Sequence, residues 1–110
     1  MSSELSVEIG KHLRSVVKGE VRFRKIDRIL YSTDASNFQI VPIGVVIPKT
    51  KEDVIHTVNV AAQYGVSILP RGGGTGLAGQ SVGYGIVIDF SKYLNRIIDV
   101  DTDKRTVKVE

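Results

Sequence analysis

The spacing of apolar residues near the N-terminus predicts a helix. Between residues 3 and 17, apolar side chains recur three or four positions apart, which places them on one buried face of a helix. Ser2 or Ser3 can cap its start, and Gly19 can close it. The apolar face consists of Leu5, Ile9, Leu13, Val16 and Val17.

Residues 21–31 mix basic and apolar positions and predict a short helix that packs against the core. Its core-facing side chains are expected to be Ile26, Ile29, Leu30 and Tyr31. Thr33 to Asn37 has the composition of a turn, because Asp, Ser and Asn side chains bond readily to nearby backbone groups. Asp34 is interpreted as a turn-forming carboxylate, since no partner acid or base lies near it in the sequence.

Residues 44–69 predict one strand–helix–strand unit. Gly44 to Ile47 is a short apolar run between prolines, as expected for a strand buried on both faces. Thr50 and Asp53 start a helix with a pattern like a capping box, and Gly65 closes it. Val66 to Leu69 follows as a second buried strand, parallel to the first through a right-handed crossover. The helix is expected to turn inward Val54, Ile55, Val58, Ala61 and Ala62.

The last part of the chain predicts a third strand and a hairpin. Tyr84 to Phe90 is apolar, whereas residues 96–101 and 105–110 alternate in polarity around a turn, which indicates the start of a separate antiparallel sheet. The expected fold class is therefore α+β, with an α/β first subdomain: a small parallel β-α-β sheet followed by the beginning of an antiparallel sheet. Because the chain stops inside an alternating run, we expect a fragment of a longer protein.

Composition excludes several classes of function. The 110 residues are 42% hydrophobic and 25% charged, ordinary values for a globular protein, and contain no cysteine for disulfides or thiolate ligands. The net charge of +3 is dispersed, which argues against nucleic acid as a partner. The longest apolar run, Ile40 to Ile47, is far shorter than the ~20 residues of a membrane span. His12 and His56 are interpreted as surface residues, and no metal site is expected.

A glycine-rich stretch joins the second expected strand to the third. Residues 70–81 contain five glycines in twelve positions. Closely spaced glycines can point several main-chain N–H groups into one concavity, which suits a phosphate. The loop leaves the C-terminal end of a parallel strand, where open α/β sheets bind ligands. A plain flexible connector is the alternative, and the flanking apolar strands with the interleaved Leu77 and Val82 argue against it.

Two common phosphate motifs overlay this loop, but neither fits its surroundings. Gly74, Gly76 and Gly79 spell G-x-G-x-x-G, yet a strand follows too soon for the helix that the dinucleotide-binding fold requires. Residues 74–81 also overlay the P-loop pattern, with Gln80 in place of its lysine. Because a neutral amide cannot offset the charge of a γ-phosphate, the sequence argues against nucleotide hydrolysis.

The succession of a strand, a long glycine loop and a strand resembles the flavin-binding domain of the vanillyl-alcohol oxidase and p-cresol methylhydroxylase superfamily. The resemblance is carried by Pro70 to Ser81, by Tyr31 to Ser36 and by Val45 to Pro48, and it covers roughly residues 31–110. It is close for FAD-linked dehydrogenases of D-2-hydroxy acids such as glycolate and D-lactate. The sequence of Tyr31 to Ser36 is most similar to that of members that fuse the flavin module to an iron–sulfur module.

The resemblance implies a domain plan and a set of cofactor-binding residues. Residues 1–38 would be a helical lead-in, and residues 39–110 the truncated first part of a p-cresol methylhydroxylase-type FAD-binding domain. The implied cofactor-binding residues are Pro70, Arg71, Gly72, Gly73, Gly74, Thr75, Gly76, Leu77, Gly79, Gln80 and Ser81. Catalytic residues would lie outside this chain, so none is assigned, and the fragment alone is expected to be inactive.

The resemblance also implies an activity: hydride transfer from a small D-2-hydroxy acid of the D-lactate, glycolate or D-2-hydroxyglutarate class to flavin N5. Several relatives attach flavin covalently through a histidine at the place of Thr75. Because no histidine or cysteine occurs between Leu69 and Ser81, we expect non-covalent FAD. An iron–sulfur cluster is expected only in a missing C-terminal part.

Other functions and locations stay open. One alternative is an NADPH-dependent flavin reductase of cell-wall precursor synthesis with the same fold. Another is a non-catalytic nucleotide- or phosphate-binding module. The sequence does not indicate the electron acceptor. A cytoplasmic location is expected, with membrane association through regions outside this chain as the alternative.

Overall fold

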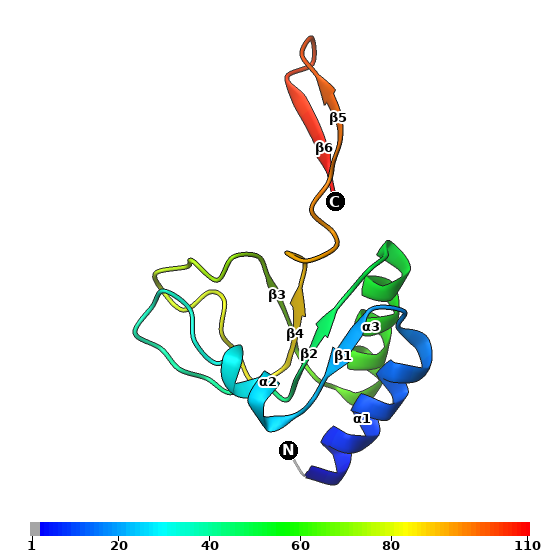
Figure 1. The fold of residues 1–110 in the computed structure, drawn as a ribbon, viewed down its shortest axis with the longest axis vertical. Helices are drawn as coiled ribbons and strands as arrows, with labels where there is room; N and C mark the ends of the chain where they lie inside the picture. The colour runs from blue at the N-terminus through cyan, green and yellow to red at the C-terminus, as the bar shows by residue number, and fades with distance from the viewer. Residues whose placement is uncertain (1–2) are drawn as a thin grey trace.

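The computed structural model describes residues 3–110, which form one four-stranded sheet with helices and a separate two-stranded hairpin (Figure 1). The elements in chain order are α1 (Ser3–Val16), β1 (Glu20–Arg22), α2 (Lys25–Leu30), β2 (Gly44–Ile47), α3 (Lys51–Tyr64), β3 (Ile68–Arg71), β4 (Ile86–Asp89), β5 (Ile97–Asp101) and β6 (Thr106–Val109). The mixed α and β fold confirms the predicted class.

The larger sheet has the strand order β1-β2-β4-β3. β2 and β3 both run parallel to β4, whereas β1 is antiparallel to β2. The predicted strand–helix–strand unit is therefore parallel as expected, but its two strands are not neighbours, because β4 lies between them. Val45 faces Val87 across one ladder, and Leu69 faces Val87 across the other.

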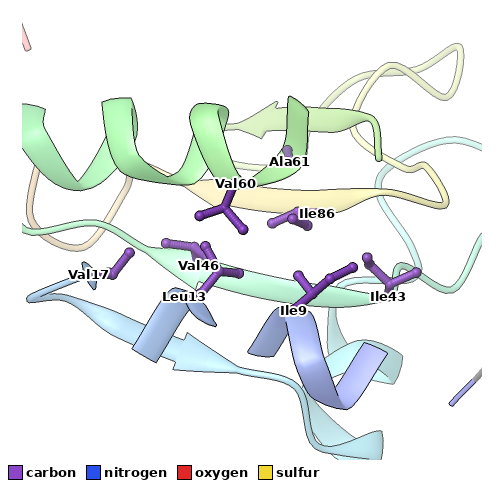
Figure 2. Close-up of a cluster of buried hydrophobic side chains, with 8 residues drawn as sticks. All are labelled: Ile9, Leu13, Val17, Ile43, Val46, Val60, Ala61 and Ile86. Carbon is purple, nitrogen blue, oxygen red and sulfur yellow. The ribbon is translucent and has the colours of Figure 1, made fainter. Parts of the chain in front are cut away.

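Helices α1 and α3 cover one face of this sheet and enclose the main core (Figure 2). Ile9, Leu13 and Val17 are all buried, which confirms the predicted apolar face of the first helix. Burying each such side chain contributes roughly 1.5–3 kcal/mol to folding. The core cluster consists of Ile9, Leu13, Val17, Ile43, Val46, Val60, Ala61 and Ile86.

The opposite face carries a smaller apolar cluster, made by Val45, Ile47 and Val87. Tyr31, Leu69 and Tyr93 pack against this cluster. Because β2 and β4 have apolar cover on both faces, every residue in both strands is buried. The prediction of a strand buried on both faces at residues 44–47 is confirmed.

The ends of α3 also match the sequence prediction. The side chain of Thr50 accepts a hydrogen bond of 3.1 Å from the N–H of Asp53, and Gly65 ends the helix in the left-handed conformation with φ 66°. The buried face of α3 was predicted only in part: Ala61 is buried as expected, but Ile55 and Val58 are 48% and 39% exposed. The buried positions are Asp53, Thr57, Val60 and Ala61.

The buried face of α3 differs from the predicted face because the helix carries a buried carboxylate. Asp53 accepts hydrogen bonds from the N–H groups of Lys18, Gly19 and Lys49, at 2.8, 2.9 and 2.9 Å. Thr57 donates to the carbonyl oxygen of Asp53 at 2.7 Å. These bonds turn a polar edge of the helix toward the sheet and leave its apolar flank at the surface.

The N-terminal part of the chain differs from the prediction in three respects. β1 was not predicted. The predicted short helix forms as α2, and Tyr31 at its end packs against the smaller cluster as expected, but Ile26, Ile29 and Leu30 are exposed. The helix instead buries Asp27, which binds Nε of Arg24 at 2.8 Å. α1 ends at Val16, while Gly19 serves a close approach: a Cβ there would lie 2.2 Å from the carbonyl oxygen of Ile47. Ser2 lies outside the described residues.

The predicted second buried strand is an edge strand. β3 has β4 as its neighbour on one side, and exposed residues alternate with half-buried ones along it. β5 and β6 form the predicted antiparallel hairpin, which projects from the body of the molecule (Figure 1). None of the helices within residues 3–110 has the length and apolar character needed to cross a bilayer.

Candidate functional site

The glycine loop runs between β3 and β4 and forms no helix. Residues 72–85 leave the C-terminal end of β3, as predicted, and remain irregular until β4 begins at Ile86. The absence of a helix after Gly79 in this described stretch confirms that the loop is not the dinucleotide-binding motif of the Rossmann type. Segment 31–41 lies beside the loop (Figure 1), and the N–H of Ala35 donates to the carbonyl oxygen of Gly74 at 3.1 Å.

The first part of the loop offers a row of available backbone donors. Within residues 3–110, no hydrogen-bond acceptor is found for the N–H groups of Gly72 to Gly76. Later N–H groups are occupied: Ala78 donates to Oε1 of Gln80 at 3.0 Å, and Ser81 donates to Oδ2 of Asp34 at 3.2 Å. An anion could bind the row from Gly72 to Gly76 without breaking any internal hydrogen bond.

Gly72 and Gly73 have open space where a side chain would be. A Cβ on Gly72 would meet nothing within 4 Å, and one on Gly73 would meet only the methyl group of Thr75 at 3.6 Å. Neither has a positive φ. Nothing in the described chain therefore requires glycine at these two positions, and the open space fits the close approach of a ligand to the backbone.

Gly74 and Gly79, by contrast, are required by the chain itself. Both adopt the left-handed region, with φ values of 69° and 82°, which favours glycine. A Cβ on Gly74 would lie 2.5 Å from Nη2 of Arg71, and one on Gly79 would lie 2.9 Å from the ring of Phe38. These glycines shape the loop.

Arg71 uses its guanidinium group within the protein. Nη1 donates to the carbonyl oxygen of Ser81 at 3.0 Å and more weakly to that of Tyr31 at 3.5 Å. Nη2 donates to the carbonyl oxygen of Thr33 at 2.8 Å. The group also lies over the ring of Tyr31, 5.3 Å from its centroid.

Asp34 forms the turn that the sequence predicted and also holds the end of the loop. Its Oδ1 accepts the N–H of Ser36 at 2.8 Å, and its Oδ2 accepts the N–H of Ser81. The hydroxyl and N–H of Ser36 lower the pKa of Asp34, with a smaller contribution from Ser81. The link to Ser81 was not predicted, because it joins residues 47 positions apart.

Tyr31 connects this region to the end of the central strand β4. Its hydroxyl donates to Oδ2 of Asp89, while Oδ1 of Asp89 accepts the N–H of Ser91 at 2.8 Å. Burial raises the pKa of Tyr31, and the bond to Asp89 raises it further. Asp89 was not predicted as a site residue, although a carboxylate directly at the end of an apolar run is a signal that indicates such a residue.

The other predicted site residues lie on both sides of the same loop. Pro70 is within β3, where it faces Ile88. Thr75 is exposed, and Leu77 is 81% exposed. Gln80 is bound within the loop, since its side-chain oxygen accepts the N–H of Ala78.

A cavity beside α3 and the hairpin lies away from the glycine loop. It has a volume of about 520 Å³ and is lined by the N-terminal part of α3, by Phe90 and Leu94 and by the hairpin. Its walls are largely apolar. Gly72 to Gly76, which carry the available N–H groups, are not among the residues that line this cavity. No group of three or more acidic or histidine side chains within residues 3–110 is arranged to hold a metal ion.

Comparison with curated proteins finds dehydrogenases much longer than this chain. D-2-hydroxyglutarate dehydrogenase of Pantoea ananatis is 40% identical over 95 residues, which cover 84% of this chain and 9% of the relative. The protein of the same name from Escherichia coli is 41% identical over 95 residues, with the same coverage. Glycolate oxidase subunit GlcD of Bacillus subtilis is 31% identical over 86 residues, covering 76% of this chain and 18% of the relative.

Solved structures show the same fold at lower identity. Alkyldihydroxyacetonephosphate synthase matches with a TM-score of 0.75 and 23% identity, over 92% of this chain and 21% of that chain. p-Cresol methylhydroxylase matches with a TM-score of 0.69 and 16% identity, also over 92% of this chain and 21% of that chain.

The family model described as the FAD binding domain matches residues 42–110. The match contains β2, α3, β3, the glycine loop, β4 and the hairpin. It therefore includes the row of available N–H groups and the strands on either side of them. The chain belongs to the FAD binding domain family.

Proposed function

We propose that this chain is the FAD-binding portion of a flavoprotein dehydrogenase that oxidises a D-2-hydroxy acid. The chain spans 9% of the length of the D-2-hydroxyglutarate dehydrogenases that it resembles, so the activity belongs to the whole protein. The observation that supports the proposal most is the row of available N–H groups from Gly72 to Gly76, within the stretch that matches the family model.

The proposed cofactor-binding residues are those of the glycine loop and its approach. A diphosphate carries negative charge whose desolvation without partners would cost several kcal/mol or more. The N–H groups of Gly72 to Gly76 would replace the lost water, and charge-assisted bonds of this kind are roughly twice as strong as neutral ones. Thr75 and Ser81 could add hydroxyl donors. The proposed set, whose members either contact the cofactor or hold the loop that does, is Pro70, Arg71, Gly72, Gly73, Gly74, Thr75, Gly76, Leu77, Gly79, Gln80 and Ser81.

Bound FAD would supply the redox chemistry, by accepting a hydride from the α-carbon of the hydroxy acid. The residues of this chain would bind and orient the diphosphate end. The scaffold beneath the loop, formed by Tyr31, Asp34 and Asp89, would hold the N–H groups in place before the cofactor arrives. We assign no catalytic residue to this chain.

We also propose that FAD is held without a covalent bond. The family resemblance implies that Thr75 stands where some members carry a flavin-linked histidine, and no histidine or cysteine lies between Leu69 and Ser81. Division into a lead-in at 1–38 and a FAD-binding part at 39–110 stays a prediction. An iron–sulfur cluster in other parts of the protein and a cytoplasmic location also stay predictions.

Spectroscopy of the purified full-length protein tests this function. We expect a flavin absorbance spectrum that is bleached under anaerobic conditions by D-2-hydroxyglutarate, D-lactate or glycolate. NADPH, L-2-hydroxyglutarate and L-lactate serve as controls and should leave the spectrum unchanged. Acid precipitation should release the flavin into the supernatant. Bleaching by NADPH alone, or flavin that stays with the acid pellet, would contradict the respective part of the proposal.

A further inference from the structure

Arg71 connects the two segments that form the glycine-loop site. It is the last residue of β3, and the available N–H groups begin with the next residue, Gly72. Its guanidinium reaches the carbonyl oxygens of Thr33 and Tyr31 in the neighbouring segment and that of Ser81 at the far end of the loop. One side chain thus bridges the start of the loop, its end and the segment beside it.

These contacts use the geometry of the guanidinium group as well as its charge. Two of its nitrogens donate to three carbonyl oxygens while its plane lies over the ring of Tyr31. A lysine ammonium is a compact point charge and cannot reproduce this planar fork. The carbonyl oxygens that Arg71 binds are neutral acceptors, so none of these contacts depends on a bound anion.

The shape of the loop around Arg71 supports the same interpretation. Gly74 leaves room for the guanidinium, since a Cβ there would lie 2.5 Å from Nη2. Two hydrogen bonds join the loop to the neighbouring segment: the N–H of Ala35 donates to the carbonyl oxygen of Gly74, and the N–H of Ser81, at the far end of the loop, donates to Asp34. The guanidinium joins the same two segments, because it binds the carbonyl group of Thr33 in one and that of Ser81 in the other.

We propose that Arg71 is a positioning residue, which holds the glycine loop in its curved shape by bridging carbonyl oxygens, and that it does not act as a charged ligand of the diphosphate. Its effect on FAD affinity rests on the proposed function. Its effect on the loop does not, because every contact that defines the role lies within the protein.

Two substitutions in the purified full-length protein distinguish the effect of the planar shape of the Arg71 guanidinium from the effect of its charge. Arg71→Lys keeps the charge and loses the fork, whereas Arg71→Gln loses both. Arg105→Gln, in the exposed turn of the hairpin, is the matched control for the loss of one positive charge. The first measurement is amide hydrogen exchange of the FAD-free protein at Ala35 and Ser81. The second is the dissociation constant of FAD at low and high salt.

We expect both Arg71 variants to increase exchange at Ala35 and Ser81, with Arg105→Gln unchanged. Both should weaken FAD binding by about tenfold or more, since each variant loses the charge-assisted hydrogen bonds that hold the loop. The salt dependence of binding should stay that of the wild type. If Arg71→Lys behaves like the wild type while Arg71→Gln loses affinity and salt dependence, Arg71 acts through its charge and the proposal is overturned.

Gly74→Ala provides a second test if the Arg71 variants do not fold. The added methyl group would displace the guanidinium while Arg71 and its charge remain, so exchange at Ala35 and Ser81 should increase. Gly73→Ala, whose methyl group meets only Thr75, is its control for exchange. Unchanged exchange in Gly74→Ala would contradict the role of Arg71. A wild-type protein that binds no FAD would instead refute the proposed function, while the exchange data would still decide the positioning role.

Discussion

The backbone at Gly85 passes so close to Ser67 that a methyl group there would lie 2.0 Å from the carbonyl oxygen of Ser67. Backbone on both sides of this contact belongs to the approaches to β3 and β4, so neither can move without disturbing the sheet. At Gly72, which lies at the other end of the same loop between β3 and β4, an added Cβ would meet nothing within 4 Å. Both positions hold glycine in the sequence, but only Gly85 lacks the space for a side chain.

We expect Gly85→Ala to lower the free energy of unfolding by about 2–3 kcal/mol or more, because an overpacked site must distort its surroundings. Gly72→Ala should leave the free energy of unfolding within about 0.5 kcal/mol of the wild type, as for a surface substitution. Urea denaturation of the FAD-free protein measures both. Equal stability of the two variants would show that the contact at Gly85 relaxes without cost.

Gly72→Ala should nevertheless weaken the binding of FAD, because a Cβ would occupy the space through which the diphosphate approaches the backbone. We expect a loss of about tenfold or more in affinity, the equivalent of one charge-assisted hydrogen bond. Titration followed by flavin fluorescence measures it. Thr102→Ala in the hairpin turn is the control. An unchanged dissociation constant in Gly72→Ala would remove this residue from the proposed site.

The sequence was informative about where the loop lies and less so about its parts. A high density of glycine identified the loop, because few other functions need so many residues without a side chain. It could not separate Gly72 from Gly74, since that difference depends on the guanidinium of Arg71 and on φ. Asp34 was correctly interpreted as a turn residue, but its bond to Ser81 depends on a tertiary contact.

At the scale of elements, a single buried carboxylate fastens α3 to the chain that precedes the sheet. Asp53 accepts three backbone N–H groups, two from the connection between α1 and β1 and one from the connection between β2 and its own helix. Burial alone would raise the pKa of Asp53, but the N–H groups of Lys18, Lys49 and Gly19 outweigh burial and lower it. The carboxylate therefore stays ionised in the folded protein at neutral pH.

We expect Asp53→Ala to destabilise the protein by about 2–4 kcal/mol, because it leaves several buried N–H groups without an acceptor. Thr57→Val, which removes the neighbouring hydroxyl and keeps the shape, should cost less. Thermal unfolding with matched urea titrations measures both. A loss below about 0.5 kcal/mol in Asp53→Ala would mean that water replaces the carboxylate.

The same carboxylate explains why sequence periodicity failed for α3. Apolar residues at Val54, Ile55 and Val58 indicated one inward face, whereas the hydrogen bonds of Asp53 turn another face toward the sheet. β1 was missed because its three residues carry two charges and one apolar side chain. β1 is a strand because it pairs with β2, and its composition alone does not indicate a strand. The buried strands β2 and β4 and the capped ends of α3, which depend on local chemistry, were predicted correctly.

On the scale of the whole molecule, acidic side chains bind their partners in the folded state. Bonds from Lys92, Tyr93 and Arg22 lower the pKa of Glu20 from 4.5 to about 2. The pKa of Asp27 is also lowered, first by its bond to Arg24. A group with a lowered pKa stabilises the folded state fully above its unfolded pKa, and this contribution is lost as the pH falls through the folded value.

We therefore expect stability to be nearly constant above about pH 5 and to fall between about pH 4.5 and 2. Glu20→Gln should cost about 1–2 kcal/mol at pH 7, a modest value because Lys92 is half exposed and its attraction is screened. The variant should also lose less stability than the wild type on acidification. Urea titrations from pH 7 to 3 measure these effects, and a wild-type curve that is flat down to pH 3 would contradict them.

The central claim is that the backbone N–H groups of Gly72 to Gly76 hold the diphosphate of FAD. Residue-resolved amide hydrogen exchange of the full-length protein, with and without FAD, tests it most directly. We expect FAD to slow exchange at Gly72 to Gly76, where no internal acceptor is present, and to change Ala35 and Ser81 little, since both are already bonded. Bound flavin that leaves exchange at Gly72 to Gly76 unchanged would contradict the claim.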